Sequence, residues 1–103
     1  MDTTAKKRLE IVIEAPVLKR LCRRLDQLEV SGYTVMPAVS GRGQNGSWSR
    51  QGEISESQRM FVLFAVLDEK DLSHVLDEVY AMVASQIGIV TVSDVQVIRA
   101  DHF

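Results

Sequence analysis

The feature that most constrains the fold is the apolar run Met60–Leu67, in which both alternating sets of residues are hydrophobic. One set is Met60, Val62, Phe64 and Val66, and the other is Phe61, Leu63, Ala65 and Leu67. In a strand, alternate side chains point to opposite faces of the sheet. A strand that is apolar on both sides is typical of the centre of a sheet covered on both faces. We therefore predict a central strand at residues 58–67.

A strand–helix–strand pattern occurs twice along the chain. Strand segments show alternation or β-branched runs, whereas helical segments repeat apolar residues every three or four positions. Pro16 suits the first turn of a helix, and Asp68 is a plausible N-cap. The predicted strands are residues 7–15, 33–39, 58–67 and 89–98, with a kink at Ser93–Asp94 in the last; the predicted helices run from Pro16 to Ser31–Gly32 and from Asp68 to Gly88.

This βαββαβ order is the ferredoxin-like α+β plan, in which two helices cover one face of a four-stranded antiparallel sheet. The length of 103 residues fits a single domain, residues 1–103. Because the helices cover only one face while the strand at 58–67 is apolar on both, the second face needs another cover. We therefore expect the chain to form an oligomer.

A polar segment without periodicity, residues 40–57, separates the second and third strands. Loops of this length inside a small domain are usually functional or disordered. Its glycines allow backbone amides to form an anion-binding nest, beside which Arg42 places a permanent cation. The same composition is also typical of a solvated hairpin loop. The sequence thus predicts a flexible loop at 40–57 that either binds an anion or only connects two strands.

Composition excludes several classes of function. The net charge of −2 and the pI of 5.6 argue against a nucleic-acid-binding protein. The apolar run Met60–Leu67 is too short to span a bilayer, and no signal-type apolar block follows the N-terminus. The single cysteine, Cys22, permits no internal disulfide and fits a reducing cytoplasm. We expect a cytoplasmic protein with no direct membrane insertion.

No catalytic or metal-binding set emerges. Cys22 falls on or beside the apolar stripe of the first helix, which favours a buried side chain over a reactive thiol. His74 lies among charged residues of the second helix, and neither it nor His102 has metal-ligand spacing with Cys22. Ser40 and Ser47 have no histidine nearby to act as a base. We therefore predict that the protein is not an enzyme and holds no metal.

Three residues are candidates for binding. Trp48 lies inside the polar loop with Arg50 two residues later, a composition typical of a protein interface. The alternative is that the indole packs back onto the domain. Arg99 follows the last strand and pairs with a phosphate or carboxylate if a neighbouring subunit brings the glycine turn close. The alternative is an ordinary surface arginine on an edge strand.

Two segments resemble a known family. Residues 32–43, which read G-Y-T-V-M-P-A-V-S-G-R-G, are similar to the signature that leads into the T-loop of PII signalling proteins. Residues 92–100, V-S-D-V-Q-V-I-R-A, resemble the closing strand of that family. The βαββαβ order and the chain length agree as well. The resemblance therefore covers nearly the whole chain and is to the PII-like branch of the PII superfamily.

The resemblance implies a homotrimeric, non-enzymatic regulator that binds nucleotides in the clefts between subunits. A T-loop, here residues 40–57, would dock on a partner, with Trp48 and Arg50 as candidate contacts. Thr34 would lie beside the base, and Arg99 would reach the phosphates from the side of the cleft. The other residues assigned to nucleotide binding are Ser40, Gly41, Arg42, Gly43, Gln44 and Gly88.

Departures from the family pattern sharpen this expectation. Gln44 and Val97 stand where the family has arginines, and the phosphate loop before the last strand is reduced to residues 87–89. These changes remove cations that a triphosphate needs, so we predict ADP or AMP rather than ATP as the ligand. No tyrosine lies between Ser40 and Ser57, so the family's uridylylation site is missing, and no sensing of nitrogen through 2-oxoglutarate is expected.

Such divergence is most similar to carboxysome-associated PII-like proteins of autotrophic bacteria. That resemblance implies a role in inorganic-carbon uptake within a carbon-concentrating mechanism, with a bicarbonate transporter as a target and bicarbonate as a second ligand. Arg42, Arg59 or a loop amide would hold the bicarbonate. The competing interpretation is an RNA-recognition module of the same topology. Residues 58–64 resemble its aromatic third strand, whereas the acidic pI argues against it.

Overall fold

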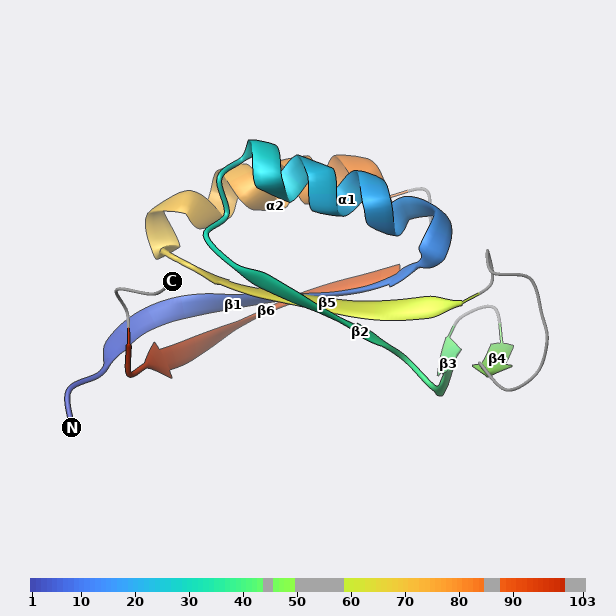
Figure 1. The fold of residues 1–103 in the computed structure, drawn as a ribbon, viewed down its shortest axis with the longest axis horizontal. Helices are drawn as coiled ribbons and strands as arrows, with labels where there is room; N and C mark the ends of the chain where they lie inside the picture. The colour runs from blue at the N-terminus through green and yellow to red at the C-terminus, as the bar shows by residue number, and fades with distance from the viewer. Residues whose placement is uncertain (44–45, 50–58, 85–87, 100–103) are drawn as a thin grey trace.

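Figure 1 shows an antiparallel sheet with both helices on one face and a small hairpin at one end. The computed structural model describes residues 1–43, 46–49, 59–84 and 88–99. The elements in chain order are β1 (Thr4–Glu14), α1 (Ala15–Gln27), β2 (Tyr33–Pro37), β3 (Ser40–Gly43), β4 (Gly46–Ser49), β5 (Met60–Leu67), α2 (Glu69–Val83) and β6 (Gly88–Val97). The main sheet has the order β2-β5-β1-β6, which confirms the predicted ferredoxin-like plan.

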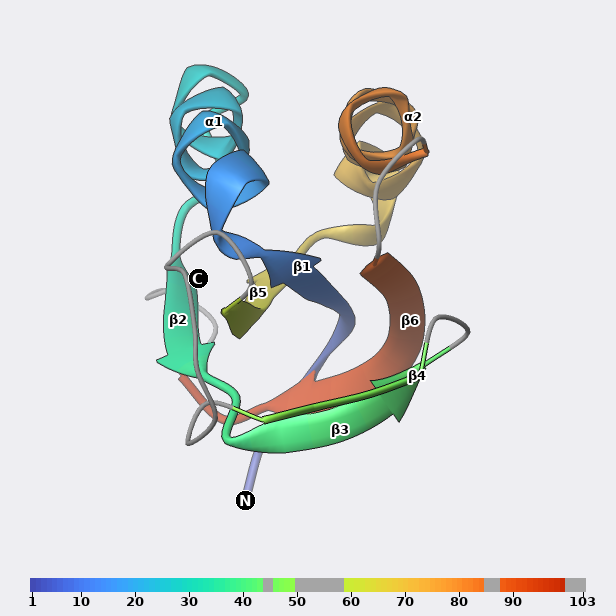
Figure 2. The same cartoon turned by 90° about the vertical axis from the view of Figure 1, so that its right-hand side faces the viewer.

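The hydrophobic core lies between the sheet and the helices, which run side by side above it (Figure 2). The alternation of β1 directs one set of its side chains at the helices, and Leu9, Ile11 and Ile13 of this set are fully buried. The register places Ile11 opposite Leu63 of β5 and opposite Val90 of β6, so the core continues across three strands. Each such buried aliphatic side chain contributes about 1.5–3 kcal/mol to folding. The fully buried residues with the largest side chains are Leu9, Ile11, Ile13, Leu21, Leu25, Leu63 and Val79.

Helix α1 ends earlier than the sequence predicts. We expected an end at Ser31–Gly32, but the last helical residue is Gln27. The backbone N–H of Val30 donates to the carbonyl of Leu25, and Glu29 has a φ of 60°. This is the Schellman arrangement, with glutamate in the left-handed position that glycine usually takes. The prediction was wrong because it placed the helix end at the glycine.

Helix α2 begins where it was predicted, after Asp68 in the N-cap position. The Asp68 side chain makes no capping hydrogen bond and instead pairs with Lys6 of β1. The helices are joined by an ion pair in which Arg24 Nε donates to a Glu78 carboxylate oxygen over 2.7 Å. Strand β6 is continuous, and the expected kink at Ser93–Asp94 does not interrupt its pairing with β1.

The segment predicted as an unstructured loop contains a hairpin. Strands β3 and β4 pair in antiparallel fashion, with Ser40 opposite Ser49 and Gly43 opposite Gly46. They form a second sheet, separate from the main one (Figure 1). Residues 50–58 of the predicted loop lie outside the described part of the chain.

Candidate ligand-binding site

The base of the hairpin is tied to the main sheet by backbone hydrogen bonds. The Ala38 N–H, between β2 and β3, donates to the Met60 carbonyl over 3.0 Å. The Ala15 N–H, at the start of α1, donates to the Arg59 carbonyl over 2.9 Å. The entry to the hairpin, the start of β5 and the start of α1 therefore lie together at one end of the sheet. We call this the hairpin end of the molecule.

Most of the residues predicted to bind a nucleotide lie at this end. Thr34 is exposed on β2, opposite Phe64. Ser40, Gly41 and Arg42 follow on β3, where Ser40 and Arg42 are exposed. Gly41 has no side chain, so a ligand can come close to the backbone of β3 at this position. The predicted contacts Gln44 and Arg50 lie outside the described residues.

Trp48 and the two arginines predicted to bind bicarbonate lie near the same base. Trp48 is in β4, opposite Gly41. Arg59 immediately precedes β5 and is exposed. Arg42 and Arg59 therefore flank the hairpin, one on β3 and one where the chain re-enters the main sheet. Two exposed guanidinium groups in this region suit a small anion.

Gly88 has a structural reason to be glycine. It is the first residue of β6 and pairs with Ile13. A Cβ atom added to it would lie 2.8 Å from the Val12 carbonyl oxygen, closer than such atoms approach. The close approach of two backbones thus explains Gly88 without a ligand. Gly88 lies at the hairpin end, because strand pairing aligns it with Ile13, Phe61 and Pro37 across the sheet. It lies on β6, however, which is the edge strand on the other side of the sheet from β2.

Arg99 lies at the other end of the sheet. Strand β6 begins at Gly88 beside Ile13 and ends with Val97 beside Thr4, so Arg99 lies about 30 Å along the sheet from Gly88. Figure 1 shows the end of β6 close to the N-terminus and far from β3 and β4. One chain therefore does not bring Arg99 to the glycine turn. If these groups act on one ligand, two copies of the chain must supply them.

The sheet face away from the helices is apolar at the hairpin end. The register forms one row across all four strands from Met36, Val62, Val12 and Ile89, and a second row from Thr34, Phe64, Glu10 and Thr91. We call these two rows the open face. Met36 is 43% exposed and Ile89 is 61% exposed, whereas Val62 and Phe64 are half-buried. The central strand is thus fully covered by its own chain on only one side.

The open face also contains a polar contact that the sequence patterns did not reveal. The Arg8 guanidinium lies 4.6 Å from the centroid of the Phe64 ring, and its Nη1 donates to a Glu10 carboxylate oxygen over 2.9 Å. A cation over an aromatic face is attracted by the ring quadrupole. The contact depends on Glu10 pairing with Phe64 across β1 and β5, which is a matter of register. It holds the Phe64 ring on the open face beside Thr34.

The titratable groups of the described residues form no catalytic set. Burial raises the pKa of the half-buried Cys22 thiol, which disfavours the reactive thiolate form. Burial and the hydrogen bond to Asp26 raise the pKa of Tyr33 to about 12. His74 is exposed on α2, as predicted. Within these residues no three His, Cys, Asp or Glu side chains are placed to hold a metal, and neither helix is long and apolar enough to cross a membrane.

Solved structures of similar proteins match nearly the whole chain. A nitrogen regulatory PII-like protein, CPII from Thiomonas intermedia K12, bound to ADP, AMP and bicarbonate, is 26% identical, with a TM-score of 0.89 over 99% of this chain and 96% of that one. The structure of the same protein bound to ADP and bicarbonate has a TM-score of 0.84 at 26% identity, and the match covers 99% of this chain and 97% of that one. A PII-like signalling protein from Thermus thermophilus is 25% identical and has a TM-score of 0.80. The match covers 100% of this chain and 99% of that one.

Comparison with models of protein families assigns nearly the whole chain to one family. No curated protein sequence matches it, but the model of the nitrogen regulatory protein P-II matches residues 6–102. The match spans every element from β1 to β6, including the hairpin. The family match supports the resemblance to PII proteins and argues against an RNA-recognition module. This chain belongs to the nitrogen regulatory protein P-II family, and the solved structures described above are of PII-like proteins.

Proposed function

We propose that this chain is a non-enzymatic regulator that binds ADP or AMP, together with bicarbonate, in clefts between the subunits of a homotrimer. The observation that carries this proposal is the whole-chain likeness to a PII-like protein bound to ADP, AMP and bicarbonate. Its support within the chain is the hairpin end, where Thr34, Gly41 and Arg42 lie beside an exposed apolar face. The ligand is a signal and is not chemically changed.

The exposed apolar residues of the open face support the proposed assembly into a trimer. Isolated monomers rarely leave large apolar patches uncovered. Copies of the chain packed through their open faces bury Met36, Val62 and Ile89 and complete the cover of β5. The same packing allows Arg99 of one copy to approach the glycine turn of another. A guanidinium paired with phosphate oxygens gives a charge-assisted hydrogen bond, which is roughly twice as strong as a neutral one.

The preference for ADP or AMP over ATP rests on the cations at the site. Val97, where the family has an arginine, is half-buried at the end of β6 beside Thr4. Arg99 follows it by two residues and keeps its charge. Each phosphate added to the ligand brings further negative charge. Without an arginine at position 97, this site has fewer cations to balance that charge than the family pattern provides. Affinity for ATP should therefore be lower than affinity for ADP.

Bicarbonate and the partner define the biological role in this proposal. Bicarbonate binds at Arg42, at Arg59 or at a backbone amide of the loop. The ligands change the conformation of the loop, residues 40–57, so that it binds a target through Trp48 and Arg50. Such a switch requires the ligand to bind one loop state better than the other. The proposed setting is inorganic-carbon uptake in the cytoplasm, with a membrane transporter of bicarbonate as the target.

Calorimetric titration tests the proposal. The purified chain is titrated with ADP, AMP and ATP, each with and without bicarbonate. We expect saturable ADP binding at up to three sites per trimer, weaker binding of ATP, and a change in nucleotide affinity when bicarbonate is present. The absence of binding by all three nucleotides would contradict the proposal. Hydrolysis of a nucleotide during the titration would contradict its non-enzymatic character.

A further inference from the structure

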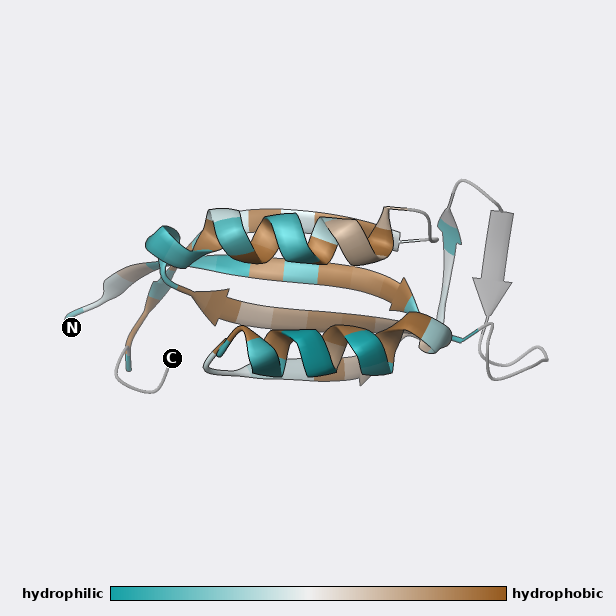
Figure 3. Cartoon of the chain, turned by 90° about the horizontal axis from the view of Figure 1, so that it is seen from above, coloured by the Kyte–Doolittle hydropathy of each residue, from teal (hydrophilic) through white to brown (hydrophobic). Residues whose placement is uncertain are grey.

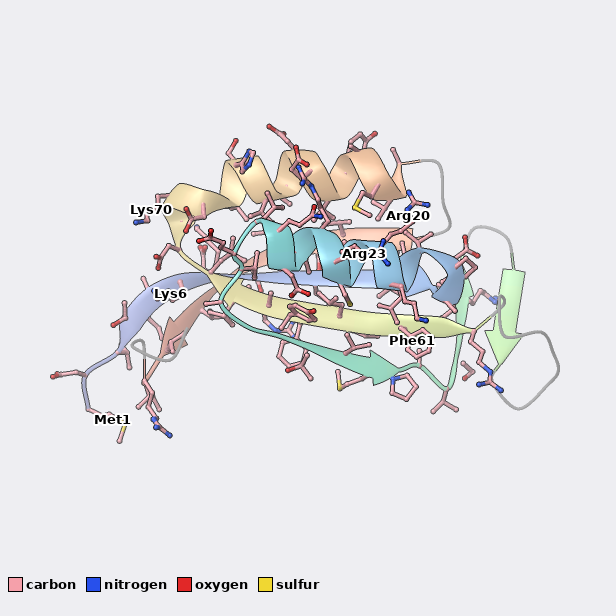
Figure 4. All side chains as sticks on the ribbon, turned by 45° about the horizontal axis from the view of Figure 1, so that its top comes forward. Met1, Lys6, Arg20, Arg23, Phe61 and Lys70 are labelled. Atoms are coloured by element: carbon pink, nitrogen blue, oxygen red, sulfur yellow. The ribbon has the colours of Figure 1, made fainter. Side chains whose placement is uncertain are left out.

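The outward side of α1 holds three cations that have no ion-pair partner among the described residues. Lys19, Arg20 and Arg23 are all exposed, and Figure 4 shows Arg20 and Arg23 along the length of α1 that leads away from the hairpin end. In contrast, Arg24 of the same helix pairs with Glu78 of α2. We call Lys19, Arg20 and Arg23 the α1 ridge.

The ridge is electrostatically unfavourable for its own helix. Lys19 and Arg23 are four positions apart, and Arg20 and Arg23 are three apart, so like charges lie side by side on the helix surface. The first turn of α1 holds no acidic residue that would offset them. Helix α2 shows the favourable arrangement, with Glu69 and Asp71 in its first turn. Among the described residues no ion pair offsets this repulsion, and a local arrangement that disfavours folding marks a candidate functional surface.

The neighbouring helix restricts what can bind the ridge. Helix α2 lies beside α1 on the same side of the sheet (Figure 2), and hydrophilic residues occur along both helices (Figure 3). Asp71 and Asp77 are exposed on α2. A membrane or a nucleic-acid duplex that covered α1 would bring its negative charges onto these carboxylates as well. A narrow anionic ligand, such as one acidic polypeptide segment, contacts α1 alone.

The ridge is continuous with the end of the molecule that carries the loop. The Ala15 N–H at the start of α1 donates to the carbonyl of Arg59, the residue that leads from the loop into β5. Arg59 is itself exposed and has the same sign of charge. A partner that binds at the hairpin can therefore reach the ridge without crossing α2.

We propose that the α1 ridge is a second docking surface, which binds an acidic polypeptide segment of the protein that the loop engages. This inference rests on the proposed function for the identity of that partner, but the ridge itself does not require a nucleotide. Carboxylates of the segment relieve the repulsion within the ridge, and two arginines allow bidentate pairing. Two weak contacts on one partner strengthen each other through their effective concentration.

Binding of a labelled poly-glutamate peptide of about 20 residues to the full chain at low salt tests the ridge, because surface charge pairs are screened by salt. The test variant is K19E/R20E/R23E, and the matched control is D71K/D77K on α2. We expect the test variant to bind the peptide at least tenfold more weakly and the control to bind at least as tightly as the wild type. Equal binding by the wild type and K19E/R20E/R23E would overturn the proposal.

Two further measurements complete the design. K19Q/R20Q/R23Q removes the repulsion within the ridge, so this variant should melt no earlier than the wild type, and it gives the same peptide comparison if K19E/R20E/R23E does not fold. Phosphatidylserine vesicles and a single-stranded RNA replace the peptide in parallel, and ridge-dependent binding of either one without peptide binding would overturn the proposal. An ADP titration of the same proteins tests the proposed function independently. If the wild type binds no ADP, the proposed function is contradicted, whereas the proposal for the α1 ridge is not.

Discussion

The two faces of the central sheet differ in how completely the chain covers them. On the helix side, Ile11 and Leu63 are fully buried. On the open face, one residue along each strand, Val12 and Val62 are only half-buried, and Ile89 at the edge is 61% exposed. The sequence is apolar on both sides of β5, yet only one side has a cover within the chain. The difference shows that the chain completes its core on one face, and in our proposal copies of the chain cover the other face.

The largest expected effect comes from the covered face. Ile11→Ala creates a cavity in the core, and we expect it to lower the free energy of unfolding by about 2–5 kcal/mol. Ile89→Ala removes the same atoms from the open face and serves as the matched control. Urea denaturation of both variants, at a concentration where the wild type is dissociated, compares the two faces directly. Equal losses of stability would contradict the division between them.

The next effect concerns assembly rather than folding. Ile89→Glu places a charge where we propose that copies of the chain meet, and burial of an unpaired charge is strongly unfavourable. We expect the variant to fold but to lose the trimer, as measured by light scattering. Tyr80→Glu is the control, since Tyr80 is 68% exposed on α2, away from the open face. An Ile89→Glu protein that remains trimeric would show that another surface forms the interface.

In the proposed trimer, Arg99 of one copy contacts the ligand bound at the glycine turn of another. Removal of a charged hydrogen bond costs about 1.5–3 kcal/mol, so Arg99→Ala should weaken ADP binding by roughly 10- to 150-fold, as measured by calorimetry. The trimer should persist. Arg23→Ala, on the outer side of α1, should leave ADP affinity unchanged. If Arg99→Ala binds ADP as the wild type does, the cleft is not lined as we propose.

The smallest effect concerns an ion pair at the end of the sheet away from the hairpin. Lys6 lowers the pKa of the Asp68 carboxyl below its ordinary value of 3.8. A depressed folded-state pKa stabilises the fold above the unfolded-state pKa, and this stabilisation is lost as the pH falls through the folded-state value. Lys6→Met should therefore reduce the acid dependence of stability between about pH 5 and 2 in urea denaturation. An unchanged pH profile would show that the pair does not contribute.

The sequence predicted the parts of the fold that depend on periodicity. Alternation at Leu9, Ile11 and Ile13 and the two apolar sets of β5 were enough to predict the order of elements and the central strand. The end of α1 was missed because Glu29 takes the left-handed position without glycine. Strands β3 and β4 were missed because Ser and Gly give no hydrophobic pattern.

The candidate site was predicted less completely than the fold. Residues around the glycine turn are close in sequence, so Thr34, Gly41 and Arg42 were predictable as a group. The contact of Arg8 with Phe64 depends on the register of two strands, which composition does not determine. The distance of Arg99 from the turn depends on the direction of β6. The arrangement in space shows that one chain cannot bring Arg99 to the glycine turn, which is why we propose that a second copy supplies it.

The central claim is that copies of the chain cover the open face and bind a nucleotide between them. Native mass spectrometry with ADP tests it most directly, because it reports assembly and ligand together. We expect an ion at three times the chain mass of 11.5 kDa carrying up to three ADP molecules, and loss of both features in Ile89→Glu. A wild-type protein that stays at 11.5 kDa, or a trimer that binds no ADP, would contradict the claim.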